Sequence, residues 1–234
     1  MARLQKFPSL SIIVPTLNEA SNLPLLLADL NAWPYEYELT IVDGGSKDLT
    51  ISIAEIQGVN IIKSHQKSRG YQMKMGASYA RANWLLFLHA DSRLDQSWIK
   101  SVFKIISNKT SKYNAWYFDF KVKKQSLEFR ILEIAVAIRS RFLQRPYGDQ
   151  GLLIHKDLYK LSGGFSSLKI MEDLDLITRI TKNAKAKRIG LDIYTDDRKW
   201  VNSNIISRAF KNARLRNKWR RGYDIENISK EYYS

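Results

Sequence analysis

The stretch Phe87-Leu88-His89-Ala90-Asp91 decides how this sequence folds. It completes an apolar run, Trp84 to Leu88, and polar Ser92 and Arg93 follow Asp91. A short apolar run of this kind is typical of a buried strand in a parallel sheet. Ligands of open α/β sheets bind just outside the carboxyl ends of the strands. The pattern therefore predicts that Asp91 faces a binding site.

Two further predicted strands also end in polar residues. The strand Leu10–Val14 runs into Pro15-Thr16-Leu17-Asn18-Glu19, and the strand Leu39–Val42 ends in Asp43, which two glycines follow. Because the carboxyl ends of neighbouring parallel strands meet at one edge of a sheet, we expect these residues to lie near Asp91. A carboxylate there can hold a hard cation and, through it, a phosphate oxygen. The three strand ends together predict a nucleotide site.

Strands and helices alternate through the first half of the chain. The predicted strands are Leu10–Val14, Leu39–Val42, Val59–Lys63 and Trp84–Leu88. The predicted helices are Glu19–Leu30, with Asn18 as its cap and Pro24 in its opening turns, Thr50–Gln57, Gly70–Ala82 and Ser97–Ser107. This alternation predicts βαβ units and a parallel sheet.

The second half has a different rhythm. We expect strands at Trp116–Val122, Gly151–His155 and Arg188–Ile193, a helix from about Met171, and a basic helical tail. A long amphipathic helix carries apolar side chains at helical spacing, namely Leu127, Ile131, Ile134, Ile138 and Phe142. The whole predicts an α/β fold whose mixed, mostly parallel sheet is flanked by helices. We predict one domain, 1–234, with a nucleotide-binding half (1–110), an acceptor and catalytic half (111–200) and a basic tail (201–234).

Composition limits the class of protein. The hydrophobic and charged fractions, 44% and 26%, are ordinary for a globular protein. The absence of cysteine excludes disulfides and cysteine-based zinc sites and favours the cytoplasm. The first fourteen residues lack the apolar region of a signal peptide, and no run approaches the roughly 18 apolar residues of a membrane span. We expect a cytoplasmic protein that is soluble or peripheral to a membrane.

The strand-end motifs also have ordinary structural interpretations. The segment from Asp43 to Asp48 can be a plain strand–turn–helix connection in which Asp48 caps the next helix. Asp91 can cap a helix near Asp95–Trp98, and His89 can be a structural histidine. Each motif alone therefore supports either a functional or a structural role.

The same holds for the charged residues at helix starts. Glu172 and Asp173 can complement a helix dipole, or one of them can serve as a general base. Arg69 can meet a diphosphate together with backbone N–H groups, or it can be a solvated surface residue.

The order of the motifs is more specific than any one of them. Seven occur in succession: Ile13-Val14-Pro15-Thr16-Leu17-Asn18-Glu19, Ile41-Val42-Asp43-Gly44-Gly45-Ser46-Lys47-Asp48, Arg69-Gly70-Tyr71-Gln72-Met73, Leu88-His89-Ala90-Asp91, Gly148-Asp149-Gln150-Gly151, Glu172-Asp173-Leu174-Asp175 and Arg198-Lys199-Trp200. Together they resemble a family 2 glycosyltransferase with the GT-A (Rossmann-like) fold, over about Leu10 to Trp200. The forms of the fourth, fifth and seventh motifs look most like the small soluble subgroup called transferase 2, which is associated with radical-SAM/selenodomain genes.

The resemblance implies an inverting enzyme that takes a sugar from a nucleotide-diphosphate sugar, most often a UDP-sugar. The positions that match donor-binding residues are Pro15, Thr16, Glu19, Asp43, Gly45, Ser46, Arg69, Gln72, Asp91, Arg198 and Trp200. Of these, the first three line the family's nucleoside pocket, and Asp43 matches the carboxylate that pairs with the pyrimidine base. Arg69 and Arg198 match positions suited to phosphate contacts. The acceptor stays undefined.

Asp91 matches the last carboxylate of the family's D-x-D-type metal motif, which implies Mn²⁺ or Mg²⁺ bound across the diphosphate. The first position of that motif is His89 here, so the metal site has one carboxylate fewer. Mg²⁺ sites often use only one or two carboxylates, and a histidine ligand would favour Mn²⁺. We expect Asp91, with His89 as the second candidate ligand, to hold the cation.

Asp173 matches the presumed base of the family's Glu-Asp pair, in which Glu172 is its neighbour. Asp149 ranks below Asp173 and could act on the acceptor or the donor sugar. A sugar hydroxyl is a poor nucleophile at neutral pH, so a carboxylate must take its proton. In a one-step inversion, the base and the leaving group lie on opposite faces of the anomeric carbon. Asp91 and Asp173, from distant parts of the chain, could meet that demand.

The net charge of +15 attracts polyanions. Between Arg198 and Tyr223 no acidic residue occurs, and basic residues mix with Trp200, Phe210 and Trp219. This mixture suits an anionic membrane at the inner face, which would bring a lipid-linked acceptor within reach. A solvated helix explains the tail equally well. A nucleic-acid-binding module is a less favoured alternative.

A nucleotidyltransferase of similar fold is another alternative, because it would attack the α-phosphate of a nucleotide in a comparable pocket. Its usual glycine-rich signature with Arg or Lys directly after the first strand is missing, since Pro15-Thr16-Leu17 occupies that place.

Overall fold

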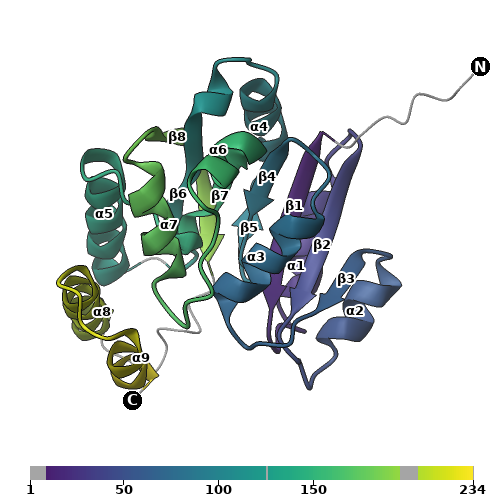
Figure 1. The fold of residues 1–234 in the computed structure, drawn as a ribbon. Coiled ribbons are helices and arrows are strands. Elements are labelled where there is room, and N and C mark those ends of the chain that lie inside the picture. Colours follow the sequence, from purple (N-terminus) through teal and green to yellow (C-terminus); the bar gives the residue numbers. More distant parts are fainter. Residues whose placement is uncertain (1–8, 125, 196–204, 234) are drawn as a thin grey trace, which may run out of the picture.

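One sheet runs through the whole molecule (Figure 1). The computed structural model describes residues 9–124, 126–195 and 205–233, and within them eight strands lie in the order β3-β2-β1-β4-β7-β6-β8-β5. The strands are β1 (Leu10–Thr16), β2 (Tyr37–Asp43), β3 (Asn60–Lys63), β4 (Trp84–Phe87), β5 (Arg93–Leu94), β6 (Asn114–Val122), β7 (Leu152–His155) and β8 (Lys185–Thr195). Both predicted halves of the chain contribute to this sheet.

The pairing of the strands is mixed and mostly parallel. Strands β3, β2, β1 and β4 are parallel neighbours, as are β6 and β8. Strand β7 pairs antiparallel with both β4 and β6, and β5 pairs antiparallel with β8. The predicted fold class is therefore confirmed.

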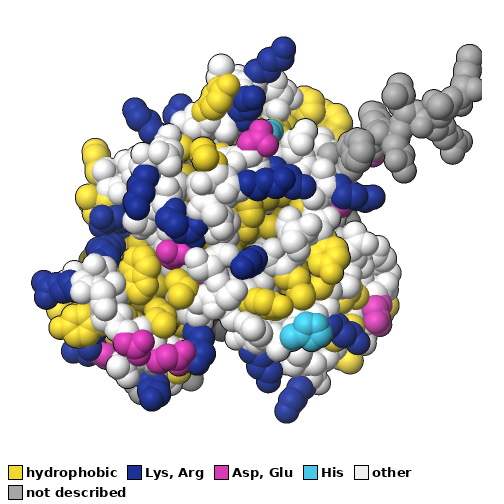
Figure 2. Space-filling model, in the orientation of Figure 1, with side chains coloured by type: hydrophobic (Ala, Val, Ile, Leu, Met, Phe, Trp, Pro, Cys, Tyr) yellow, Lys and Arg dark blue, Asp and Glu magenta, His cyan; other side chains and the backbone are white. Residues whose placement is uncertain are grey.

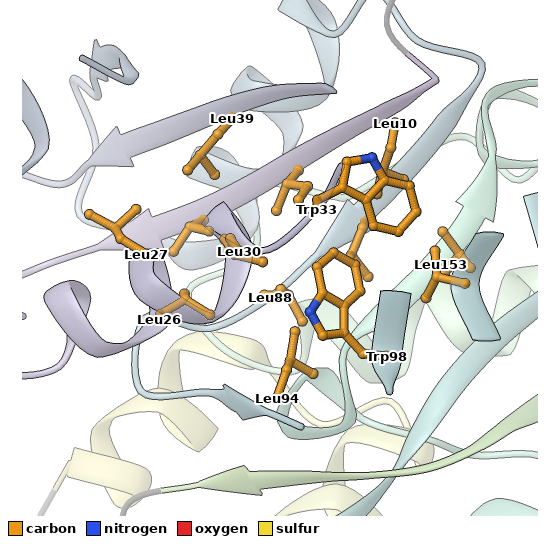
Figure 3. Packing of buried hydrophobic residues seen from close by; sticks show 14 of the residues in the cluster. Leu10, Leu26, Leu27, Leu30, Trp33, Leu39, Leu88, Leu94, Trp98 and Leu153 are labelled. Carbon is orange, nitrogen blue, oxygen red and sulfur yellow. The ribbon is translucent and has the colours of Figure 1, made fainter. Parts of the chain in front are cut away.

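Helices cover both faces of the sheet. Helices α1 (Leu23–Asn31), α2 (Thr50–Ile56) and α4 (Trp98–Ile106) pack on one face, where Trp33 stacks on Trp98 at 4.9 Å between ring centroids (Figure 3). Helices α3 (Arg69–Tyr79), α6 (Lys156–Leu161) and α7 (Glu172–Ile180) pack on the other. Burying the strands on both faces explains why they read as continuous apolar runs.

Three more helices lie beside this core, at the left of Figure 1. Helix α5 (Leu127–Phe142) packs on β6 through Phe129 and Val136. The basic tail forms two helices, α8 (Ile205–Arg220) and α9 (Ile225–Tyr233), which enclose Leu215 and Ile228 against Ile170. The tail is thus folded onto the domain.

Several predicted boundaries were wrong. Helix α1 begins at Leu23 instead of Glu19, because Asn18 adopts a left-handed backbone with φ of 57° and joins a loop instead of capping the helix. Pro24 lies in the first turn of α1, as predicted. The structure adds α6 and β5, and it extends β8 beyond the predicted Arg188–Ile193 at both ends.

Candidate active site

The loops after β1 and β2 are joined by the carboxylate of Asp43. Thr16 Oγ1 donates to Asp43 Oδ1 at 3.0 Å, and the backbone N–H groups of Gly45 and Ser46 donate to Oδ2 at 2.8 Å each. The side chain of Ser46 adds a further hydrogen bond, at 2.5 Å, and Asp43 is only 1% exposed. The loop is therefore shaped by the same carboxylate that we expect to contact the base.

Further hydrogen bonds hold these two loops together. Gln72 donates from Nε2 to the carbonyl oxygens of Thr16 (2.9 Å) and Val42 (2.6 Å). Asp48 accepts from the backbone N–H groups of Ala20 and Thr50, both at 3.0 Å, so it ties the loops together as well as supporting the start of α2. These contacts make the ends of β1 and β2 one rigid wall.

Arg69 and Glu172 form an ion pair between the start of α3 and the start of α7. Gly70 permits this approach, since a Cβ at that position would lie 2.4 Å from the carbonyl oxygen of Ser166. Glu172 is fully buried, and this burial raises its pKa against the opposing effect of Arg69. Burial lowers the pKa of Arg69, but the charges of Glu172 and Asp173 outweigh it, so the net shift is upward. Arg69 is a fixed cation.

Asp91 lies in the turn that follows β4, on the carboxyl side of the strand as predicted, and is 6% exposed. Its Oδ2 accepts a hydrogen bond from Thr195 Oγ1, at the end of β8, at 3.2 Å. Asp91 does not cap a helix, because β5 follows it and α4 begins only at Trp98. The structural interpretation of this residue as a helix cap is therefore wrong.

Asp173 is oriented by two backbone N–H groups. Gly148 donates to Oδ2 at 2.8 Å, and Leu174 donates to Oδ1 at 2.7 Å. A Cβ on Gly148 would lie 2.8 Å from His89 Nε2 and 3.5 Å from Asp173 Oδ2. Gly148 thus fits between the two side chains and brings them close together.

The loop that carries Gly148 is fastened from behind by Gln150. The Oε1 atom of Gln150 accepts from Ser140 Oγ at 2.7 Å and from Arg139 at 3.1 Å, and its Nε2 donates to the carbonyl oxygen of Phe118 at 3.1 Å. The guanidinium of Arg139 also lies 3.6 Å from the ring centroid of Tyr147. The position of the loop is therefore fixed by α5 and β6.

Residues from these loops, strand ends and helix starts meet in one cleft of about 300 Å³. It is lined by Pro15, Thr16, Leu17, Glu19, Lys67, Arg69, Gln72, His89, Ala90, Asp91, Tyr147, Lys169, Ile170, Met171, Asp173, Asn212, Arg216, Tyr232 and Tyr233. An adjoining space, which contains Asp149, shares Arg69, His89, Tyr147 and Asp173 with the cleft. Of the residues that the sequence analysis expected to share a site, the cleft brings together Thr16, Asp91 and Asp173.

The remaining predicted residues are not in the lining. Asp43, with Gly45 and Ser46 bound to it, lies behind Thr16, and Glu172 is buried behind Arg69. Their observed contacts position the residues of the cleft wall. Arg198 and Trp200 lie outside the described residues.

The cleft also contains residues that the sequence analysis missed. Lys67, Tyr147 and Lys169 come from loops, while Arg216 and Tyr232 come from the tail. Arg216 was noticed only as one of a run of cations. The mixture of basic and aromatic residues in the tail signals an anionic ligand, but only the folding of α8 and α9 brings that mixture to this cleft.

The side chains of the cleft can hold a metal ion only if a bound ligand supplies further oxygen atoms. Within the described part of the chain, no group of three or more His, Cys, Asp or Glu side chains is placed to hold an ion. Asp91 and His89 do line the same cleft, and Mg²⁺ is commonly bound by one or two carboxylates together with substrate phosphates. The residues therefore fit a cation that is shared with a bound diphosphate.

The sequence matches the family model described as glycosyl transferase family 2 over residues 11–154. The chain belongs to this family. A PGL/p-HBAD biosynthesis glycosyltransferase of Mycobacterium tuberculosis (strain ATCC 25177 / H37Ra) is 40% identical over 94 residues, which are 37% of this chain and 37% of that relative. The predicted family is thereby confirmed.

Solved structures confirm the GT-A type of fold. The mannosyltransferase PcManGT from Pyrobaculum calidifontis, in complex with GDP-Man and Mn²⁺, has a TM-score of 0.68 at 17% identity, over 98% of this chain and 70% of that one. TarS 1–349 of S. aureus, in complex with UDP-GlcNAc, has a TM-score of 0.66 at 16% identity, over 96% and 70%. In the described parts of this glycosyltransferase, no helix combines the length and apolar character needed to cross a bilayer.

Proposed function

We propose that this glycosyltransferase moves a sugar, with inversion, from a UDP-sugar to the hydroxyl of an acceptor, with Mn²⁺ or Mg²⁺ bound. The observation that carries the proposal is the common cleft of Asp91 and Asp173, which are 82 positions apart in the sequence. The structures of similar fold that hold GDP-Man with Mn²⁺ or UDP-GlcNAc support a nucleotide-sugar donor.

The ends of β1 and β2 would receive the nucleoside. Pro15, Thr16 and Glu19 line that side of the cleft, and the loop around Asp43 is held rigid behind them. The diphosphate would then lie near the cations of the cleft, which are Lys67, Arg69, Lys169 and Arg216. These charges would neutralise the negative charge that gathers on the leaving group as its bond to the sugar breaks.

Asp173 would act as the general base. As the acceptor oxygen forms its bond to the anomeric carbon, the bond to the diphosphate breaks and the acceptor proton passes to the Asp173 carboxylate. The backbone N–H groups of Gly148 and Leu174 fix the direction of that carboxylate, and general-base help is typically worth about 10²–10⁴-fold in rate. Asp149, in the adjoining space, would contact a sugar hydroxyl.

Asp91, with His89 beside it, would hold the divalent cation. When bound, the cation supplies a positive charge that helps to stabilise the departing diphosphate. Thr195 Oγ1 keeps the Asp91 carboxylate in place, so the protein contributes one pre-oriented oxygen donor to the site.

Three finer assignments belong to this proposal. The His89-Ala90-Asp91 and Gly148-Asp149-Gln150-Gly151 motifs support membership of the transferase 2 subgroup. The parts 1–110, 111–200 and 201–234 would serve donor binding, catalysis and, for the tail, closure of the cleft. The basic character of the chain supports a lipid-linked acceptor at the inner face of an anionic membrane.

A thermal-shift panel of nucleotide sugars, with and without Mn²⁺, tests the proposal, because ligands that bind the folded state raise its apparent stability. We expect UDP-sugars to raise the melting temperature in the presence of Mn²⁺. Asp91→Asn should remove this Mn²⁺-dependent gain. Asp173→Asn should preserve it while lowering sugar transfer or hydrolysis by about 10²–10⁴-fold.

The exposed carboxylate of Asp157, which lies outside the cleft, offers the matched control. Asp157→Asn should behave like the wild type in both assays. If GDP-Man stabilised the protein and UDP-sugars did not, the proposal that the donor carries uridine would be contradicted. Loss of nucleotide binding in Asp173→Asn would assign that residue to the donor pocket and remove it from the role of base.

A further inference from the structure

Helix α5 presents a continuous apolar face to solvent. Five large side chains that follow helical spacing are more than half exposed: Leu127, Ile131, Ile134, Ile138 and Phe142. We call these five residues the α5 stripe. It is about 22 Å long, at 1.5 Å per residue, and Figure 2 shows hydrophobic and basic side chains along the left edge, where α5 lies in Figure 1. Contiguous exposed apolar patches commonly mark interaction sites.

The fold does not need the α5 stripe. The helix is anchored to β6 by its opposite face, where Phe129 and Val136 are buried. Ser140 on that face binds Gln150, which holds the active-site loop. Helix α5 therefore buries one apolar face in the core and leaves a second apolar face exposed to solvent.

The charges around the α5 stripe are mainly positive. Lys123 and Lys124 are exposed just before the helix, and Arg130 and Arg141 are exposed along one flank. Two acidic groups near this face already accept from cations: Glu133 from Lys121 at 2.9 Å, and Asp119 from Arg188. Glu128 is the exposed acidic residue of the helix.

We propose that α5 is a membrane-docking helix, with the α5 stripe inserted into an anionic lipid leaflet and the flanking cations at the headgroups. An apolar face with a Lys/Arg-rich border is the pattern of helices that lie in the plane of a membrane interface. Self-association is disfavoured by charge. In an antiparallel pair of α5 helices, Arg130 of one copy would oppose Arg141 of the other, because the two residues lie about three turns apart on the same flank.

The position of α5 also relates the bilayer to the active site. A groove of about 850 Å³ runs between α5 and the strands β6 and β8, and its lining includes Ile134, Ile138, Phe142 and Phe120. Phe120 also lines the space that contains Asp149 and Asp173. The groove and the space beside Asp149 therefore share Phe120 as a wall residue, which, on the basis of the proposed function, would bring an amphiphilic acceptor from the leaflet next to the active site.

Vesicle co-sedimentation tests the docking without any sugar chemistry. The purified protein should bind vesicles of phosphatidylcholine that contain phosphatidylglycerol and should bind pure phosphatidylcholine poorly. The double variant Leu127→Gln/Ile131→Gln should weaken binding to the anionic vesicles roughly tenfold or more. Its Mn²⁺-dependent thermal shift with UDP should match the wild type, since neither residue lines the cleft.

The matched control replaces one leucine and one isoleucine that are also more than half exposed but lie elsewhere, Leu161 (72%) and Ile56 (82%). Ile56→Gln/Leu161→Gln should bind vesicles like the wild type. An equal loss in the control, or wild-type binding by the α5 variant, would overturn the proposal. The proposal would also be overturned if the wild type did not bind vesicles and formed a dimer that Leu127→Gln/Ile131→Gln converted to a monomer. The α5 stripe would then be an interface between two copies of the chain.

Discussion

Replacing Gly148 with alanine should disturb the active site through a single added methyl group. The added Cβ would stand 2.8 Å from His89 Nε2, while ordinary contacts begin near 3.4 Å. Either the His89 ring or the loop must therefore move by about 0.6 Å, the difference between the two distances. The backbone at Gly148 lies outside the left-handed region, so the effect is steric.

Two magnitudes follow from this displacement. Overpacking of this kind costs about 1–3 kcal/mol, which corresponds to a fall of about 2–12 °C in melting temperature for a domain of this size. Because misplacement by 1 Å can cost about 10²-fold in rate, we expect kcat/KM to fall by about tenfold or more. Scanning calorimetry and a UDP-release assay measure the two effects.

A double-mutant cycle isolates the contact. In a His89→Ala background the methyl group has room, so Gly148→Ala should then cost little further stability. The reasoning is refuted if Gly148→Ala melts and turns over like the wild type, or if its cost in stability is the same with and without the His89 side chain.

Three other predictions concern the cleft cation Arg216, the divalent metal and the buried carboxylate of Glu38. Arg216→Ala should weaken UDP binding about tenfold, measured by isothermal titration calorimetry, because the Arg216 side chain lines the cleft. Replacing the exposed Arg221 with alanine should leave the affinity for UDP unchanged. Equal affinities of the two variants would exclude Arg216 from the donor site. Removing divalent metal with EDTA should abolish sugar transfer, and added Mn²⁺ should restore it. Activity that survives EDTA would contradict the proposed need for a divalent cation. Burial acts to raise the pKa of Glu38, but hydrogen bonds from Ser11, Arg81 and Ala82 outweigh it, so the pKa lies below its ordinary value of 4.5. The stabilisation by the Glu38 carboxylate is therefore present above pH 4.5 and is lost as the pH falls through the lowered pKa. The difference in melting temperature between the wild type and Glu38→Gln should shrink as the pH is lowered. A difference that stays constant with pH would contradict this prediction.

The first half of the fold could be predicted because its information is local. Apolar runs mark the core parts of β1, β2 and β4, namely Ile12–Val14, Ile41–Val42 and Trp84–Phe87, and polar residues follow them, as Asp43 and Asp91 do. A strand that is buried on both faces of the sheet needs apolar side chains at successive positions, so the pattern is visible in the sequence. The start of α1 was misplaced because the loop before it is shaped by distant partners, such as the backbone N–H of Lys47, which donates to Asn18 Oδ1.

The tertiary structure also adds a role for two predicted site residues. Hydrogen bonds to Asp43 and from Gln72 hold the ends of β1 and β2 together, and the predicted contacts of these two residues with the donor stay predictions. The helical spacing of the α5 stripe would ordinarily indicate a face turned to the core, and the structure turns it outward. Periodicity shows that a face exists, but it does not say which neighbour covers it.

The sequence by itself determined the alternation of strands and helices, the family, and the carboxylates that carry the proposed chemistry, since each depends on residues close together or on ordered motifs. Only the tertiary structure decided that Arg69 is paired with Glu172, that Gly148 separates His89 from Asp173, and that Arg216 reaches the cleft. These contacts join segments far apart in the chain. Their distances depend on how the helices pack on the sheet, and no local pattern encodes that packing.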